Sequence, residues 1–318
     1  MRGGLVTGTT GFVGTALVAR LVDEGRFFVR AAVRRESGEL PAAVERVVVG
    51  DLTPDADWEP ALAGVDAVVH LAARVHVMRE ATADPLAEFR RVNVGGTLNL
   101  ARQAAAAGVR RFVFLSSVKV NGEGGSAAYR ETDPPAPQDA YGISKHEAEL
   151  GLHEIAAETG IEVVIIRPPL VYGPGVKANF HALLRAVARG MPLPLGAIHN
   201  RRSLVALDNL VDLIVTCIDH PAAANQTFLV SDGEDLSTTE LIRRLARAMG
   251  RPARLIPVPT VALMAGATLL GKREMAARLC GSLQVDITKA RKVLGWTLPV
   301  SVDEGLRRTA EHYLQQRQ

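Results

Sequence analysis

The sequence contains very little cysteine and few aromatic residues. Cys217 and Cys280 are the only cysteines among 318 residues, and they stand far apart with no CxxC pair. This disfavours a disulfide framework and a structural zinc site. Aromatic residues make up 4% of the chain, too few to form a stacking platform for nucleic acid, and His70, His76 and His181 lack metal-ligand spacing. We therefore expect a cytoplasmic protein with no metal site and no nucleic-acid partner.

Long hydrophobic runs are also missing. The longest, VALMAGATLLG at 261–271, is about half as long as a membrane-spanning helix. We expect it to be a packed helix; contact with a membrane surface or a partner is the alternative. The N-terminal MRGGLVTGTTGFVG lacks the apolar core and cleavage site of a signal peptide. Charge is nearly balanced, with 37 basic and 34 acidic residues. We expect no membrane insertion.

The chain does contain a regular alternation of apolar and amphipathic stretches. Apolar runs predict strands at 4–8, 29–34, 45–51, 66–73, 110–117 and 162–168, and the stretches around them predict helices near 12–24, 58–63, 84–107 and 140–159. Continuous apolar strands separated by helices are typical of a parallel sheet covered on both faces. The sequence therefore predicts an α/β protein.

The alternation of apolar and amphipathic stretches becomes irregular after about residue 173, where prolines and glycines are frequent. A further strand, QTFLVSD at 226–232, is expected to rejoin the first sheet before a helix at 237–249. We predict a Rossmann-type, doubly wound parallel sheet over residues 1–172 and a smaller C-terminal α/β substrate lobe over 173–318.

A glycine-rich turn follows the first predicted strand. TGTTGFVG places Gly8, Gly11 and Gly14 at G-x-x-G-x-x-G spacing. A tight turn needs a residue that tolerates positive φ, and a pyrophosphate needs backbone that it can approach closely. The following helix would present its unpaired N–H groups to the anion. We predict dinucleotide binding here; a merely structural glycine turn is the alternative.

The residues after the second predicted strand bear on the choice of cofactor. Twenty positions beyond Gly14 stands Arg34, followed by Arg35, and the first carboxylate is Glu36. An acidic residue here takes the ribose hydroxyls, whereas an arginine suits a 2′-phosphate. We therefore prefer NADP(H). The alternative is that both arginines are solvated and the site accepts NAD.

Two further strand ends are candidates for contact with the cofactor. In GDL, Asp51 could accept from the adenine amino group and Leu52 could pack on its ring. In HLAA, Leu71 and the small residues Ala72 and Ala73 leave room for the dinucleotide. Both segments lie at carboxyl ends of strands, where ligands of such sheets bind.

Three residues could carry acid/base chemistry. Tyr141 and Lys145 stand four apart in AYGISKHEAE, and Ser117 ends the fifth predicted strand. A hydride that arrives at a carbonyl generates an oxyanion that needs a proton, which a tyrosine can give. An ammonium one helical turn away would favour the phenolate, and Ser117 would orient the reacting oxygen.

These motifs together resemble the extended short-chain dehydrogenase/reductase family, and within it the NAD(P)-dependent nucleotide-sugar epimerases and dehydratases. The resemblance spans nearly the whole chain. It rests on TGTTGFVG, GDL, HLAA, VNVGGT, SSVKVNG, YGISK and RPPLVYGPG. It implies that Tyr141 is the acid/base, that Lys145 holds the ribose and tunes the tyrosine, and that Ser117 polarises the substrate hydroxyl. Asn93 would support the backbone of the active site.

The resemblance also implies contacts outside these motifs. Arg202 in NRRSLVALDNL and Arg278 before LCGSLQVD would bind the diphosphate of a UDP-sugar, while Asn179 and Phe180 would line the base pocket. Each of these would otherwise be read as a solvated residue. Further cofactor contacts would come from Phe12, Val13 and Pro168. A homodimer would form through the helices at 84–107 and 140–159.

The choice of reaction depends on departures from the family pattern. Dehydratases carry Asp-Glu after the catalytic residue, whereas this chain has Val118-Lys119, which disfavours dehydration. ARVHVMRE, SSVKVNGE and GSLQVDITKARKVLGW resemble the branch that reduces UDP-linked 4-keto sugars for surface-polysaccharide precursors. Such an NADP(H)-dependent reductase is our leading hypothesis. The alternatives are a UDP-hexose 4-epimerase (UDP-glucose or UDP-N-acetylglucosamine) with tightly bound NAD, and a non-catalytic dinucleotide-binding subunit.

Overall fold

The computed structural model describes residues 2–36, 38, 40–75 and 84–316. In this part of the chain the main sheet has seven strands, all parallel, in the order β3-β2-β1-β4-β5-β6-β9. These strands are β1 (Arg2–Thr7), β2 (Phe27–Val33), β3 (Glu45–Val48), β4 (Ala67–His70), β5 (Arg111–Leu115), β6 (Glu162–Arg167) and β9 (Gln226–Leu229). The order reverses between β1 and β4, which is where such sheets bind ligands.

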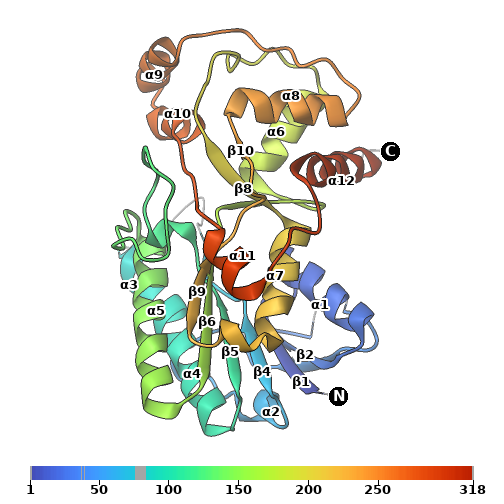
Figure 1. Ribbon diagram of the computed structural model, residues 1–318, viewed down its shortest axis with the longest axis vertical. Coiled ribbons are helices and arrows are strands. Elements are labelled where there is room, and N and C mark those ends of the chain that lie inside the picture. The colour runs from blue at the N-terminus through green and yellow to red at the C-terminus, as the bar shows by residue number, and fades with distance from the viewer. Residues whose placement is uncertain (1, 37, 39, 76–83, 317–318) are drawn as a thin grey trace.

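Helices cover both faces of this sheet (Figure 1). One face is covered by α1 (Phe12–Glu24) and α7 (Leu207–Asp219), and the other by α2 (Glu59–Leu62), α4 (Thr97–Ala106) and α5 (Ala140–Thr159). Every residue of β4 is buried, because its run of apolar side chains faces a helical layer on each side. The predicted Rossmann-type α/β fold is confirmed.

The helix predicted near 84–107 contains a change of winding. It consists of α3 (Pro85–Phe89), a π-helical segment η1 (Arg90–Gly96) and α4. A Cβ on Gly96 would lie 2.6 Å from Cγ of Leu52, so the glycine lets the loop after β3 approach closely. Such segments are rare and often lie at functional sites. Here η1 carries the buried Asn93.

A second sheet forms the centre of the lobe. It has the order β10-β8-β7, from β7 (Leu170–Tyr172), β8 (Arg202–Ala206) and β10 (Asp235–Leu236). Around it pack α6 (Ala178–Ala188), α8 (Thr238–Ala248) and α12 (Val302–Gln315), which together bury a separate apolar core. β9 pairs with β6 in the main sheet, although it follows the first lobe elements in sequence. The division at 172/173 remains a prediction.

A loop of the main domain is joined to the lobe. After β5 come η2 (Val118–Val120) and the loop that leads to α5. In this loop the N–H of Tyr129 donates to O of Gln284 over 2.8 Å, and its carbonyl accepts from N of Asp286 over 2.8 Å. These bonds connect the loop to the segment before α11 (Thr288–Leu294). The short helix η3 (Pro221–Ala223) follows α7.

The apolar stretch at 261–271 forms α9 (Thr260–Leu269), which is followed by α10 (Arg273–Cys280). No residue of α9 is buried. The expected helix is present, but it is only partly packed: Leu263 contacts the lobe core, whereas Val261 and Leu269 are exposed. The two helices stand at the end of the lobe, far from the main sheet (Figure 1). Within the described ranges, every helix is too short or too polar to cross a membrane.

Candidate functional site

The glycine turn after β1 depends on close backbone packing. Gly8 has φ +70°, and a Cβ there would lie 2.8 Å from N of Ala72. A Cβ on Gly14 would lie 2.1 Å from the carbonyl oxygen of Gly8. The N–H of Gly11 donates to that same carbonyl over 2.9 Å. Glycine is thus required at Gly8 and Gly14 for the turn to sit between the ends of β1 and β4.

The N-terminus of α1 has the properties of an anion site. Its N-cap, Gly11, supplies no side-chain hydrogen bond, so the first N–H groups of the helix stay available to a ligand. The hydroxyl of Thr9 is buried and, within the described residues, has no hydrogen-bond partner. Phe12 and Val13 pack against the core beneath. A dinucleotide pyrophosphate fits this arrangement of open donors and absent Cβ atoms.

One threonine connects the ends of β1 and β4. The hydroxyl of Thr7 accepts from the N–H groups of Leu71 and Ala72, each over 3.1 Å, and contacts Nδ1 of His70 at 2.8 Å. Because that oxygen already accepts twice, its proton goes to Nδ1, which leaves the proton of His70 on Nε2, 3.0 Å from Oγ1 of Thr97. Burial lowers the pKa of His70 to about 3. His70 is therefore a neutral structural residue.

The other residues that are predicted to contact the cofactor at these strand ends are more exposed to solvent. Ala73 is half-buried beyond β4, and Leu52 packs on η1. Arg34, which follows β2, lies 3.7 Å from a carboxylate oxygen of Asp51, and the side chains of both are more than three-quarters exposed. Sequence reasoning assigned these two residues to different parts of the cofactor and did not foresee that they pair. His76 lies outside the described residues.

Tyr141 and Lys145 project from the first turns of α5. The Tyr141 ring meets the edge of Phe89, with centroids 6.2 Å apart. Nζ of Lys145 lies 6.0 Å from the centre of the Tyr141 ring and 4.3 Å from that of Phe114, and it donates to the carbonyl of Leu115 over 2.8 Å. Burial lowers the pKa of Lys145 to about 7, against the attraction of Glu149. Burial, together with the Asp139 carboxylate, raises the pKa of Tyr141.

Ser117 lies beyond the end of β5, at the N-cap of η2. Its hydroxyl is half-buried and accepts from N of Lys119 over 3.2 Å. The following N–H, of Val118, donates to the carbonyl of Pro168 over 3.0 Å. This bond holds the chain after β5 against the chain after β6. Ser117, Pro168 and Lys145 thus meet at the carboxyl end of the β5–β6 pair.

A buried ion pair lies directly beneath these residues, and sequence reasoning missed it. Glu149 receives two hydrogen bonds from Arg167, of 2.9 and 2.5 Å, and a third of 2.5 Å from Oγ of Ser116. The side chains are 3% and 7% exposed. Arg167 also donates to Oδ1 of Asn121 over 3.1 Å. The network fixes neighbours of Lys145, Ser117 and Pro168 at once.

A signal for this pair was present in the sequence. Glu149 stands one helical turn beyond Lys145, and Arg167 is the charged last residue of an apolar strand. A charge that ends a buried strand needs a partner.

Asn93 joins three segments. Its Oδ1 accepts from N of Arg74 over 2.7 Å, and its Nδ2 donates to O of Arg74 and to Oγ of Ser144, each over 3.0 Å. Asn93 is buried in η1, so these bonds hold the chain after β4 against α5. They do so close to Tyr141, whose carbonyl accepts from Ser144.

The lysine that departs from the dehydratase pattern is fully engaged. Lys119 pairs with Asp139 and, over 2.9 Å, with Glu123. Asp139 caps α5 by accepting from N of Gly142 over 2.7 Å. Lys119 therefore balances the charge of Asp139 beside Tyr141. At its position this chain lacks the carboxylate that dehydratases use for the elimination.

In the lobe, the structure brings the two predicted arginines together. Arg202, the first residue of β8, donates to the carbonyls of Arg278 and Gly281 over 2.6 and 3.1 Å. Its pKa is lowered by burial, which the Glu123 carboxylate counters. The Arg278 side chain is exposed.

The two residues predicted for the base pocket lie in different environments. Asn179 is exposed near the start of α6. Phe180 is buried and stacks on Tyr172, with centroids 5.5 Å apart. The Phe180 ring thus packs in the lobe core, a role that its sequence pattern did not indicate.

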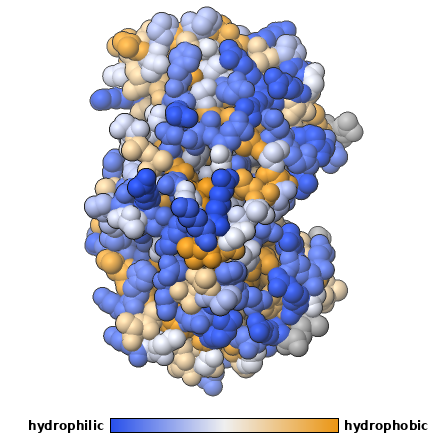
Figure 2. Space-filling view, viewed as in Figure 1, coloured by the Kyte–Doolittle hydropathy of each residue, from blue (hydrophilic) through white to orange (hydrophobic). Residues whose placement is uncertain are grey.

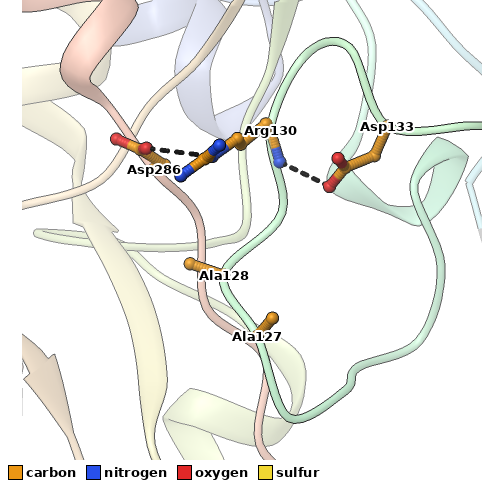
Figure 3. Close-up of a pocket in the computed structure, with 5 residues that line it drawn as sticks. All are labelled: Ala127, Ala128, Arg130, Asp133 and Asp286. Carbon is orange, nitrogen blue, oxygen red and sulfur yellow. Dashed lines mark hydrogen bonds and ion pairs between the residues drawn. The ribbon is translucent and has the colours of Figure 1, made fainter.

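A cavity of about 530 Å³ opens between the loop after η2 and the segment before α11 (Figure 3). Its lining is Ala127, Ala128, Arg130, Asp133 and Asp286. Arg130 closes it on both sides: its N–H donates to Asp133 over 2.8 Å and its side chain pairs with Asp286 at 3.5 Å. The predicted catalytic residues Ser117, Tyr141 and Lys145 are not part of this lining.

Comparison with known proteins agrees with the geometry. Residues 4–231 match the NAD dependent epimerase/dehydratase family. The chain is 50% identical over 314 residues to the UDP-glucose 4-epimerase of Vibrio cholerae, covering 98% of this chain and 95% of that protein.

Two solved structures are similar over almost their whole length. The UDP-glucose 4-epimerase of Thermotoga maritima with UDP-glucose has 25% identity and a TM-score of 0.78, covering 99% of this chain and 100% of that one. MoeE5 in complex with UDP-glucose and NAD has 27% identity and a TM-score of 0.79, with the same coverage. The chain therefore belongs to the NAD dependent epimerase/dehydratase family, as the resemblance predicted, and is an enzyme of the extended short-chain dehydrogenase/reductase type.

Proposed function

We propose that the protein is a UDP-hexose 4-epimerase that works with bound NAD on UDP-glucose or UDP-N-acetylglucosamine. The observation that carries this proposal is the 50% identity, along 98% of the chain, to the Vibrio cholerae UDP-glucose 4-epimerase. The same similarity goes against the 4-keto-sugar reductase that the sequence motifs favoured. The alternative reading therefore replaces the leading one.

NAD is favoured over NADP by the surroundings of Arg34. Its guanidinium is paired with Asp51, and a carboxylate at that place would repel a 2′-phosphate. The match to an NAD dependent family and the NAD complex of MoeE5 point in the same direction. Gly8, Gly14 and the open N-terminus of α1 would hold the pyrophosphate.

The proposed chemistry uses three side chains. The chemistry that bound NAD would supply is acceptance of a hydride from C4 of the sugar, return of that hydride to the opposite face, and a positive charge beside the phenol of Tyr141. Tyr141 would take the proton of the C4 hydroxyl and give it back to the oxygen of the 4-keto sugar. Ser117 would hydrogen-bond that oxygen and keep it aligned.

Lys145 would set the protonation of Tyr141. In the structure the half-buried Tyr141 lies near the Asp139 carboxylate, and burial and this charge together raise the pKa of the phenol, so a nearby cation is needed to release its proton. Lys145 is the cation on the same helix, and its pKa of about 7 makes its charge sensitive to the cofactor hydroxyls placed around it. The ring of Phe89 lies against Tyr141 and the ring of Phe114 against Nζ of Lys145.

The lobe would hold the UDP moiety, with Arg202 and Arg278 at the diphosphate and Asn179 near the base. Arg202 uses Nη1 for the two carbonyls, which leaves Nη2 and Nε for a phosphate. Asn179 is exposed at the start of α6. A homodimer through α4 and α5 is part of the proposal, supported by Leu150, which is 50% exposed on α5.

The deciding experiment follows UDP-glucose with the purified protein and no added coenzyme. We expect UDP-galactose to form to equilibrium with no net change in nicotinamide absorbance, and stoichiometric NAD to be released on denaturation. UDP-N-acetylglucosamine is assayed in parallel. If NADPH were oxidised in the presence of a 4-keto UDP-sugar and no epimerisation occurred, the result would support the reductase hypothesis instead. If neither the UDP-sugar nor the coenzyme were consumed, the result would indicate a non-catalytic dinucleotide-binding subunit.

A further inference from the structure

The α9–α10 hairpin, residues 260–280, exposes more apolar surface than any comparable described segment. Val261, Leu269 and Leu270 are 84%, 89% and 74% exposed, and Met275 on α10 is 58% exposed. Exposed large hydrophobic side chains elsewhere in the described chain are at most 60% exposed. In Figure 2 a small hydrophobic group is visible at the upper left, over α9. Several exposed large apolar side chains on one short segment favour a contact with a partner or a membrane.

Positive charge is concentrated around the same hairpin. Residues 250–277 contain four basic residues, Arg251, Arg254, Lys272 and Arg273, and one acidic residue, Glu274, a net charge of +3. The whole chain carries +3, so the remaining residues sum to zero. All four basic side chains are exposed, and none is paired with a carboxylate among the described residues.

The tip of the hairpin combines both features in consecutive residues. Leu269 and Leu270 end α9, Gly271 turns the chain with φ +66°, and Lys272 and Arg273 begin the return. Leucines can enter the boundary between headgroups and acyl chains, while the long basic side chains reach back to lipid phosphates. This order of residues fits a layered surface that is apolar inside and anionic at its edge.

We propose that the hairpin docks the protein peripherally on an anionic phospholipid bilayer, with Leu269 and Leu270 inserted and Lys272 and Arg273 at the phosphates. A second copy of the chain fits less well, because pairing two such hairpins across a two-fold axis would bring like charges together. α9 lies at the end of the lobe away from the main sheet (Figure 1), whereas α10 leads back to the carbonyls of Arg278 and Gly281 that bind Arg202. Docking through the end that carries Leu269 and Leu270 leaves the candidate active site accessible from water. The inference does not depend on the proposed reaction.

The test is flotation of the full-length protein with vesicles. We expect it to float with phosphatidylcholine vesicles that contain phosphatidylglycerol and to stay behind with phosphatidylcholine alone, and we expect added salt to weaken the binding. Leu269→Ser/Leu270→Ser should lower the partition coefficient at least about tenfold, since the inserted area is lost. Lys272→Ser/Arg273→Ser should lower it by about thirtyfold at low salt.

Matched controls separate the hairpin from general surface effects. Phe28→Ser removes an apolar side chain that is 45% exposed on β2, and Arg102→Ser removes an exposed cation of α4; neither should change flotation. Circular dichroism and urea unfolding verify that each variant is folded.

The proposal is overturned if the wild-type protein does not float with anionic vesicles, or if the hairpin variants float as well as the wild type. If the wild-type protein does not bind vesicles and the leucine variant forms a smaller oligomer than the wild type, the hairpin is instead a contact between copies of the chain.

Discussion

The carboxyl ends of the main sheet and the proposed ligand side of the lobe are built differently. Around Lys145 the polar groups are buried and already paired: Lys145 donates to a carbonyl, and Glu149 accepts three hydrogen bonds. On the lobe, Asn179 and Arg278 are exposed, and Arg202 is held by two backbone carbonyls. The first region is arranged before any ligand arrives, whereas the second has groups still free to turn.

This difference has a physical consequence. A group held in place by its surroundings costs little to order when the ligand binds, so its interactions act fully on the reaction. An exposed arginine loses side-chain freedom on binding and contributes mainly to affinity. We therefore expect changes at the sheet to affect catalysis and stability, and changes in the lobe to affect substrate binding.

The largest effect should come from Tyr141→Phe. Removing the phenolic hydroxyl removes the proposed acid/base, so epimerisation should fall by a factor of about 10² to 10⁴. Because the ring and its contact with Phe89 remain, the urea unfolding curve and the bound NAD should be unchanged. The measurement is kcat for UDP-glucose. Activity that survives in this variant would contradict the assignment of Tyr141.

The next largest effect should come from Glu149→Gln. Arg167 would then be a buried charge without its counter-charge, and the free energy of unfolding should drop by about 3–5 kcal/mol. The matched control is Glu147→Gln, on the same helix and also paired with an arginine, Arg90, but on the surface. Urea unfolding should not resolve that change. Equal losses in the two variants would remove the contrast between buried and exposed polar groups.

A smaller effect is expected from Arg278→Ala, which removes an exposed arginine of the proposed diphosphate site. Loss of a charged phosphate contact should raise KM for the UDP-sugar by about 10- to 100-fold, while the bound NAD is retained. Arg201→Ala, which removes another exposed arginine of the lobe, is the control and should leave KM unchanged. If kcat fell and KM did not, the lobe would be as directly involved in the reaction as the sheet.

The smallest effect for a single measured step, one pH unit, should be the pH dependence caused by Lys145. Its pKa is about 7 in the folded protein and 10.5 ordinarily, so between these values only the unfolded chain holds that proton. In that window the free energy of unfolding of NAD-free protein rises with pH, by up to about 1.4 kcal/mol per unit. Lys145→Met should remove this rise. Urea unfolding near neutral and at moderately alkaline pH gives the two slopes, and equal slopes would mean that Lys145 is not desolvated.

Local features of the site could be predicted from the sequence. The glycine turn, the strands that flank it and the helix that carries Tyr141 and Lys145 follow from spacing and periodicity over a few residues, and α5 has the predicted bounds 140–159. The family could be recognised because its motifs occur in order. The preference for a reductase with NADP(H) came from residues such as Arg34 read in isolation, and the comparisons do not support it.

The sequence by itself determined the order of elements, the fold class and the residues that form the turn and the candidate catalytic set, because these depend on near neighbours along the chain. Only the tertiary structure decided which distant groups meet: Arg34 with Asp51, Glu149 with Arg167, and Phe180 with Tyr172. It also decided that α9 would be left exposed. Burial and pairing depend on the packing of separate segments, and the periodicity of one segment does not contain that information.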